Sequence, residues 1–161
     1  MTRQKPLNEP EDTRGEECIE FTNKTSLHIQ EEGVGATFLN PRRRELRKVR
    51  YDGCYNRTNG RGQADFIVGF HRSVDVIVEL KASDLKRALI QIEDTLVAWE
   101  KDPIRFPQIV CLIVFGHTFP RMNSRLGVIE REFLLSHRTL LWMRESGSEK
   151  FRFSNLQGKR P

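Results

Sequence analysis

The sequence predicts an α/β fold, a mixed β-sheet flanked by helices, and three observations carry this prediction. Residues 64–70 and 74–80 are short runs rich in Phe, Ile and Val, separated by a turn, and are typical of a β-hairpin. Apolar residues then recur at helical spacing over residues 85–99. A Val- and Ile-rich run at residues 109–115 is typical of a strand buried on both faces. A strand, a helix and a strand in succession predict a crossover between parallel strands.

The chain of 161 residues is long enough for one domain with a sizeable core. We expect residues 1–15, which are polar and contain prolines, to form an extended or disordered arm. Residues 16–161 should then form a single domain. The net charge of +5 favours an anionic partner such as nucleic acid.

Strands are marked less clearly in the first third of the chain. Residues 25–30 alternate loosely between apolar and polar, and residues 36–39 form a short apolar run that ends at an Asn-Pro turn signal. Residues 42–50 are the densest basic run. They either contact phosphates or form a solvated edge strand, in which basic side chains discourage aggregation. We favour phosphate contacts, made by Arg43, Arg47, Lys48 and Arg50.

Ionisable residues interrupt or directly follow the apolar runs of the hairpin, among them Asp65, Glu79 and Lys81. A charge in a strand this apolar is costly unless it is paired, solvated or bound to a metal ion. Glu79 and Lys81 share one face of their strand, about 7 Å apart. A two-residue loop would place Asp65 opposite Leu80 on the apolar face, whereas a three-residue loop places it opposite Glu79. We expect the three-residue loop, because burying a lone Asp costs more than changing the turn.

The last third of the chain predicts a second helix and a closing hairpin. Residues 121–137 show a helical pattern of apolar residues. Residues 139–143 and 151–153 lie on either side of Gly147, so we expect them to pair. For the first helix, Ser83 is the predicted N-cap.

The cysteines and the hydropathy restrict the compartment. Cys18, Cys54 and Cys111 are far apart and odd in number, so they fit neither a disulfide framework nor a zinc cluster. A reducing, cytoplasmic location is the resulting expectation. No apolar run approaches the length of a membrane span or the core of a signal peptide, and we expect no membrane partner.

Paired acids next to a lysine indicate metal chemistry. Two neighbouring carboxylates repel each other, so the pKa of one rises unless a cation lies between them. Oxygen ligands from Asp65 and Glu79 suit Mg²⁺ or Mn²⁺. Lys81 beside such an ion would orient or deprotonate a water for attack on a phosphodiester. Asp52 is a candidate third acid, although Asp-Gly is first of all a turn signal. The alternative is an exposed ion pair on a solvated sheet face.

Asp65, followed at the end of the next strand by Glu79 and Lys81 and then by a helix, resembles the PD-(D/E)xK nuclease superfamily. This group includes restriction endonucleases and Holliday-junction resolvases. The resemblance covers about residues 48–115 and implies a restriction-endonuclease-like core that hydrolyses nucleic-acid phosphodiesters, expected to be DNA, with Mg²⁺ or Mn²⁺ and a metal-activated water. It makes Asp65 and Glu79 metal ligands, Lys81 the water-orienting lysine and Gln91 a catalytic residue on the helix.

The chain departs from this family pattern at two points. Ala64 precedes Asp65 where the name-giving motif has Pro, and the early helix with a Glu found in many members has no clear counterpart. The main alternative is therefore a catalytically inactive module of the same fold that binds nucleic acid or a protein partner. A purely structural or immunity-type interaction protein is a third interpretation. A second copy of the chain also stays open as a partner.

Overall fold

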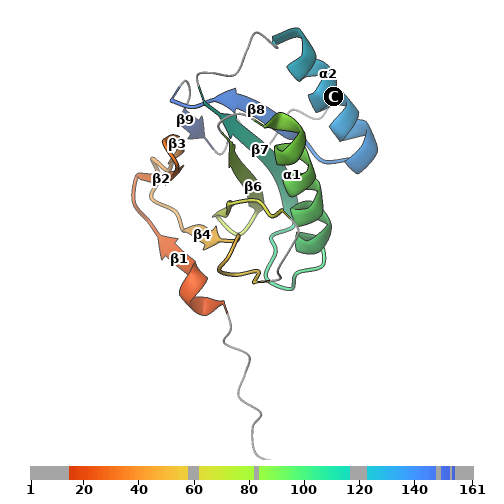
Figure 1. Cartoon of the computed structure of the whole chain (residues 1–161). Coiled ribbons are helices and arrows are strands. Elements are labelled where there is room, and N and C mark those ends of the chain that lie inside the picture. Colours follow the sequence, from red (N-terminus) through yellow and green to blue (C-terminus); the bar gives the residue numbers. More distant parts are fainter. Residues whose placement is uncertain are drawn as a thin grey trace, which may run out of the picture.

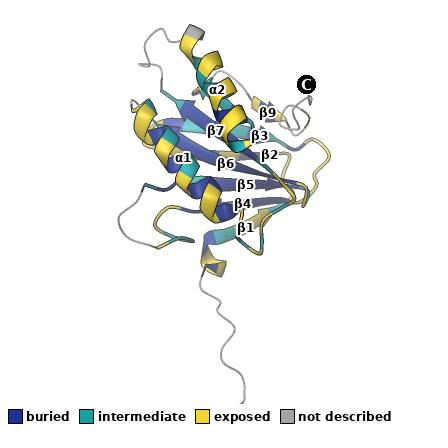
Figure 2. Ribbon diagram, turned by 90° about the vertical axis from the view of Figure 1, so that its right-hand side faces the viewer, coloured by how far each residue is buried: buried dark blue, intermediate teal, exposed yellow. Residues whose placement is uncertain are grey.

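Two β-sheets and two helices form three layers (Figure 1). The structure, a computed structural model, describes residues 15–57, 62–81, 84–116, 123–147, 150–152 and 154. The larger sheet lies in the middle, with both helices on one face and the smaller sheet on the other (Figures 1 and 2). Of the expected N-terminal arm, all but Gly15 lies outside the described residues.

The larger sheet is mixed, as predicted. In spatial order its strands are β1 (Ile19–Thr22), β4 (Leu46–Arg50), β5 (Phe66–Phe70), β6 (Val74–Lys81), β7 (Gln108–Phe115) and β8 (Leu141–Glu145). Neighbours are antiparallel from β1 to β6, whereas β6, β7 and β8 are parallel to one another. The carboxyl ends of these three parallel strands therefore meet at one edge of the sheet.

The smaller sheet was not predicted as a separate layer. It contains β2 (Ser26–Glu31), β3 (Val34–Leu39) and β9 (Lys150–Arg152), with β2 antiparallel and β9 parallel to β3. The expected closing hairpin of residues 139–143 and 151–153 is thus wrong. Its two halves join different sheets, because Leu141 and Met143 pack under the helices whereas Phe151 packs in the core between the sheets.

α1 (Leu85–Trp99) connects β6 to β7, and α2 (Asn123–His137) connects β7 to β8. The N-cap of α1 is Asp84, whose carboxylate accepts a hydrogen bond from the Arg87 backbone N–H at 3.0 Å. Ser83, the predicted N-cap, lies outside the described residues. A short 3₁₀ helix, η1 (Glu16–Cys18), precedes β1.

Two apolar cores flank the larger sheet. The core facing the smaller sheet contains alternate residues of β6, joined by Leu27, Ile29, Phe38 and Phe151. The core under the helices contains the intervening β6 residue Ile77, joined by Ala88, Ile92, Leu96, Trp99 and Phe133. Because successive side chains of a strand point to opposite faces, β6 supplies both cores, and a polar residue on either face is buried.

A disulfide joins Cys18 of η1 to Cys54, across 36 residues of sequence and with Cα atoms 5.7 Å apart. The expectation that the cysteines stay unpaired is therefore wrong. Pairing of β1 with β4 brings the two ends together, because the turn that follows β4 carries Cys54. Cys111 is free and buried. The cysteines thus no longer argue for a reducing compartment, and none of the helices described here is long and apolar enough to span a membrane.

Candidate functional site

The β5–β6 hairpin sets the position of the predicted acids. Phe70 pairs with Val74 and Phe66 pairs with Val78, so the loop has three residues, as predicted. Continued by one step, this register places Asp65 opposite Glu79. Asp65 is anchored there because its Oδ2 accepts a hydrogen bond from the backbone N–H of Leu80 at 2.7 Å.

Glu79 is a buried carboxylate with almost no partners. Its side chain is 1% exposed, and Lys81 Nζ lies 3.8 Å from Oε1. Glu79 Oε2 is buried and has no hydrogen-bond partner among the described residues. Burial, and then the negative charge of Asp65, raises the pKa of Glu79 from an ordinary 4.5 to about 9, with Lys81 opposing the shift.

Asp65 shares its environment with an acid that the sequence analysis missed. Burial raises the pKa of Asp65 from 3.8 to about 7, and the hydrogen bond from Leu80 opposes this shift. The Glu31 side chain raises it further, through a hydrogen bond to Asp65 and through its charge. Glu31 therefore adds a further acidic group to the surroundings of Asp65.

Glu31 ends β2 in the smaller sheet, so it reaches the site from a different layer. The turn signal at Gly33 could have located the end of this strand, since Glu32 and Gly33 both have positive φ. No signal in the sequence shows that this end packs against Asp65, because that contact depends on how the two sheets stack.

Asp52 lies in the exposed turn after β4, and its negative charge raises the pKa of both Asp65 and Glu79. The turn is held close by the Tyr51 backbone N–H, which donates to the Asp65 carbonyl at 3.0 Å. The disulfide through Cys54 ties the same turn to η1. Four carboxyl groups thus influence one another at this edge: Glu31, Asp52, Asp65 and Glu79.

α1 holds the segment that leads into Asp65. Thr95 Oγ1 accepts a hydrogen bond from the Ala64 backbone N–H at 2.8 Å, and Gln91 Nε2 donates to the Gln63 carbonyl at 3.2 Å. Gln91 is buried, and its Oε1 has no hydrogen-bond partner in the described part of the chain. Gln91 therefore positions the backbone beside the acids.

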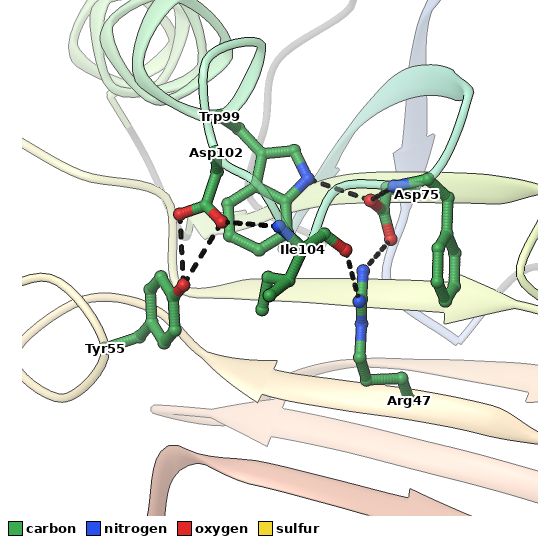
Figure 3. Close-up of polar contacts among 7 residues, drawn as sticks. Arg47, Tyr55, Asp75, Trp99, Asp102 and Ile104 are labelled. Carbon is green, nitrogen blue, oxygen red and sulfur yellow. Dashed lines mark hydrogen bonds and ion pairs between the residues drawn. The ribbon is translucent and has the colours of Figure 1, made fainter. Parts of the chain in front are cut away.

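Arg47 does not lie on the surface, contrary to its predicted role as a phosphate contact. It is 4% exposed, and its guanidinium donates to Asp75 Oδ1 at 2.6 Å and to the Ile104 carbonyl at 2.7 Å (Figure 3). The guanidinium also stacks over the Phe106 ring at 3.9 Å. The sequence pattern did not reveal the buried partner, Asp75, which lies two strands away on the same face of the larger sheet. We correct the prediction for Arg47.

The other three predicted basic contacts are dispersed. Lys48 is paired with Glu20 at 2.8 Å. Arg50 is exposed and lies opposite Phe66 in the β4–β5 ladder, next to Asp65. Arg43 is exposed in the loop before β4, at the far end of the sheet from the acids. Of the four, Arg50 is at the same edge as Glu79.

The acids suit a hard divalent ion. Within the described ranges, no group of three or more His, Cys, Asp or Glu side chains is arranged to hold a metal ion. Mg²⁺, however, is commonly held by one or two carboxylates and keeps several waters. The unpartnered, buried Glu79 Oε2 beside Asp65 fits such an ion, which would compensate charges that now raise both pKa values.

Comparisons of the chain with protein-family models, with curated proteins and with solved structures found no match. The site therefore has to be interpreted from its own geometry and chemistry. The mixed α/β architecture is established, whereas the resemblance to the PD-(D/E)xK nucleases stays a sequence prediction.

Proposed function

We propose that this protein is a metal-dependent nuclease with a restriction-endonuclease-like core, which hydrolyses DNA phosphodiester bonds. One observation carries the proposal: Glu79, 1% exposed, keeps a carboxylate oxygen without a partner among the described residues. A buried, unpaired carboxylate costs stability, so a protein retains it where a ligand completes it. Asp65 beside it and Lys81 at 3.8 Å supply the other groups that phosphodiester hydrolysis needs.

Asp65 and Glu79 would hold Mg²⁺ or Mn²⁺, with Glu31 or Asp52 as a further acid. When bound, the ion would supply Lewis-acid stabilisation of the phosphate and lower the pKa of a water. Asp65 and Glu79 would hold the ion in their carboxylate forms, because only these forms are ligands.

Lys81 acts on the substrate side of the acids. Its side chain is 27% exposed, so the amino group reaches both the buried Glu79 carboxylate and solvent. From there Nζ orients the attacking water and stabilises the negative charge that develops on the phosphate. Gln91 fixes the approach to Asp65 through the Gln63 carbonyl. Arg50, exposed at the same edge, contacts a neighbouring phosphate.

The test is cleavage of plasmid, linear, branched and single-stranded DNA, and of RNA, with Mg²⁺ or Mn²⁺. Glu79→Gln removes the proposed ligand without changing the shape of the side chain and should abolish cleavage. Glu132→Gln is the matched control, because Glu132 is an exposed acid on α2, and it should leave cleavage unchanged. A wild-type protein inert on every substrate would refute the nuclease.

The second candidate is a catalytically inactive module of the same fold that binds nucleic acid or a protein. It is favoured by the lack, among the described residues, of a preformed group of three metal-binding side chains. Calorimetric titration with Mn²⁺ separates the two: the nuclease binds the ion through Asp65 and Glu79, and the inactive module does not. The cytoplasmic location stays a prediction.

A further inference from the structure

A groove of about 420 Å³ opens at the end of the smaller sheet that is remote from the acids. It is lined by Thr25, Ser26, Leu39, Pro41 and Arg152. The β2–β3 and β3–β9 ladders explain why these residues meet, because Leu39 pairs with Ser26 on one side and with Arg152 on the other. The groove thus depends on three strands from distant parts of the sequence.

Asn40, which is 2% exposed, holds the basic loop of residues 42–44 beside this groove through hydrogen bonds. Its Nδ2 donates to the carbonyls of Lys24 at 2.9 Å and Arg44 at 2.6 Å, and its Oδ1 accepts from the Arg44 backbone N–H at 3.1 Å. The Asn40 backbone N–H donates to the Thr25 carbonyl at 2.7 Å. These bonds fix residues 42–44 against the turn before β2.

The cations beside the groove are not paired with acidic side chains in the described part of the chain. Arg42, Arg43, Arg44 and Arg152 are all exposed, and none of them forms an ion pair with another residue of the described chain. Beside them the groove offers the hydroxyl groups of Thr25 and Ser26. Guanidinium groups with hydroxyl donors bind phosphate oxygens, so this surface complements an anionic backbone.

The groove and the acids lie at opposite ends of one strand. β2 runs from Ser26, which lines the groove, to Glu31, whose negative charge raises the pKa of Asp65. Six residues of extended chain span about 17 Å. One strand of duplex DNA places a phosphate about every 3.4 Å along the axis, so this span is about five nucleotides. Between the two ends, Lys150 of β9 adds an exposed cation opposite Thr37.

We propose that this groove is a second phosphate-binding site, which holds the sugar–phosphate backbone of the nucleic-acid substrate about five nucleotides from the bond that is cleaved. The inference rests on the proposed nuclease function and adds where the flank of the substrate lies. It also explains a basic loop, residues 42–44, that is too far from the acids to act in the chemical step.

The test is binding of fluorescent duplex and single-stranded oligonucleotides in EDTA, so that the readout does not depend on cleavage. Arg42→Ala/Arg152→Ala should weaken binding about tenfold and lower the salt slope by about one to two units. The matched control is Arg125→Ala/Arg131→Ala, which removes the same charge from exposed positions on α2 and should bind like wild type. Circular dichroism checks that both proteins fold.

Oligonucleotide length sharpens this test. The groove variant should bind more weakly than the control at every length, and the difference should be largest for oligonucleotides of about five nucleotides or more, which can span the distance to the acids. Equal binding by both variants at every length, or no binding by the wild type, would overturn the proposal that the groove binds phosphates. Groove-dependent binding without cleavage would refute the nuclease and leave the binding site in place, so the two failures are distinguishable.

Discussion

Asp75 and Glu79 lie on the same face of β6, and both side chains are almost completely buried, yet their surroundings are opposite. Asp75 accepts hydrogen bonds from three donors: the Arg47 guanidinium at 2.6 Å, the Trp99 indole at 2.9 Å and the Phe106 backbone N–H at 2.7 Å (Figure 3). This carboxylate joins β4, α1 and the loop before β7. Its role is to hold the fold together.

Glu79 has one cation, Lys81 at 3.8 Å, and an oxygen with no partner in the described chain. Burial alone therefore does not distinguish a structural carboxylate from a functional one. The hydrogen-bond partners distinguish them, because a completed carboxylate stabilises its neighbours and an incomplete one is available to a ligand.

Removing Asp75 should have the largest effect. Asp75→Ala leaves the Arg47 guanidinium buried without its counter-ion, which typically costs about 3–5 kcal/mol. Urea denaturation measures the loss. Arg47→Met/Asp75→Ala should lose less than the sum of the single variants, since no unpaired charge stays buried. Additive losses would show that the pair is not coupled.

Lys81 sharpens the comparison, because it is the cation paired with Glu79 in the same way that Arg47 is the cation paired with Asp75. Lys81→Ala should lower the cleavage rate about 100-fold, or about 2.7 kcal/mol, with little change in Mn²⁺ affinity. Stability should change by about 1 kcal/mol or less, since the pair is long and partly exposed. A loss of stability equal to that of Asp75→Ala would make Lys81 structural and break the comparison.

Glu79→Gln should stabilise the metal-free protein by a few kcal/mol at pH 8, because each pH unit between the two pKa values of Glu79 is worth about 1.4 kcal/mol. The pKa of Glu79 is raised in the folded state, so folded protein binds more protons than unfolded protein between about pH 4.5 and 9. The stabilising contribution of that proton is full below pH 4.5 and is lost as the pH rises through 9. Thermal melts from pH 5 to 9 should therefore fall less steeply for Glu79→Gln. Parallel curves would contradict the raised pKa.

Mn²⁺ should raise the melting temperature of the wild type by a few degrees at pH 8 and by less at pH 6. The reason is that Asp65, with a pKa of about 7, and Glu79, with a pKa of about 9, must both lose protons to bind the ion. Glu79→Gln should show little shift of the melting temperature at either pH. Asp75→Ala keeps both proposed ligands, so the ion should shift its melting temperature as it does that of the wild type. An equal shift at both pH values would place the metal ion elsewhere.

Local chemistry made the centre of the fold predictable. The cost of burying Asp65 on an apolar face fixed the three-residue loop and hence its place opposite Glu79, and the structure confirms that register. Helical periodicity predicted α1 and α2, with ends within a few residues of those observed.

Contacts between layers and between distant segments were not predictable. The basic composition of residues 42–50 predicted Arg47 to be a phosphate contact and gave no sign of the buried Asp75 with which it pairs. Cys18 and Cys54 meet only because β1 pairs with β4, and Glu31 reaches Asp65 only because a second sheet packs on the first. Each of these contacts depends on how distant segments pair or pack, and the periods of two or 3.6 residues in the sequence carry no information about that.

The pairing of β9 with β3 joins segments more than one hundred residues apart, with Phe38 and Phe151 rings 5.4 Å from each other. Contacts of such long range require closure of a large loop and form late in folding. During synthesis on the ribosome, β2 and β3 would leave the ribosome before β9, so the smaller sheet would have only two of its three strands until β9 is synthesised. The groove at Arg152 is therefore completed last. A nascent chain would bring Asp65 and Glu79 together before it completes this groove.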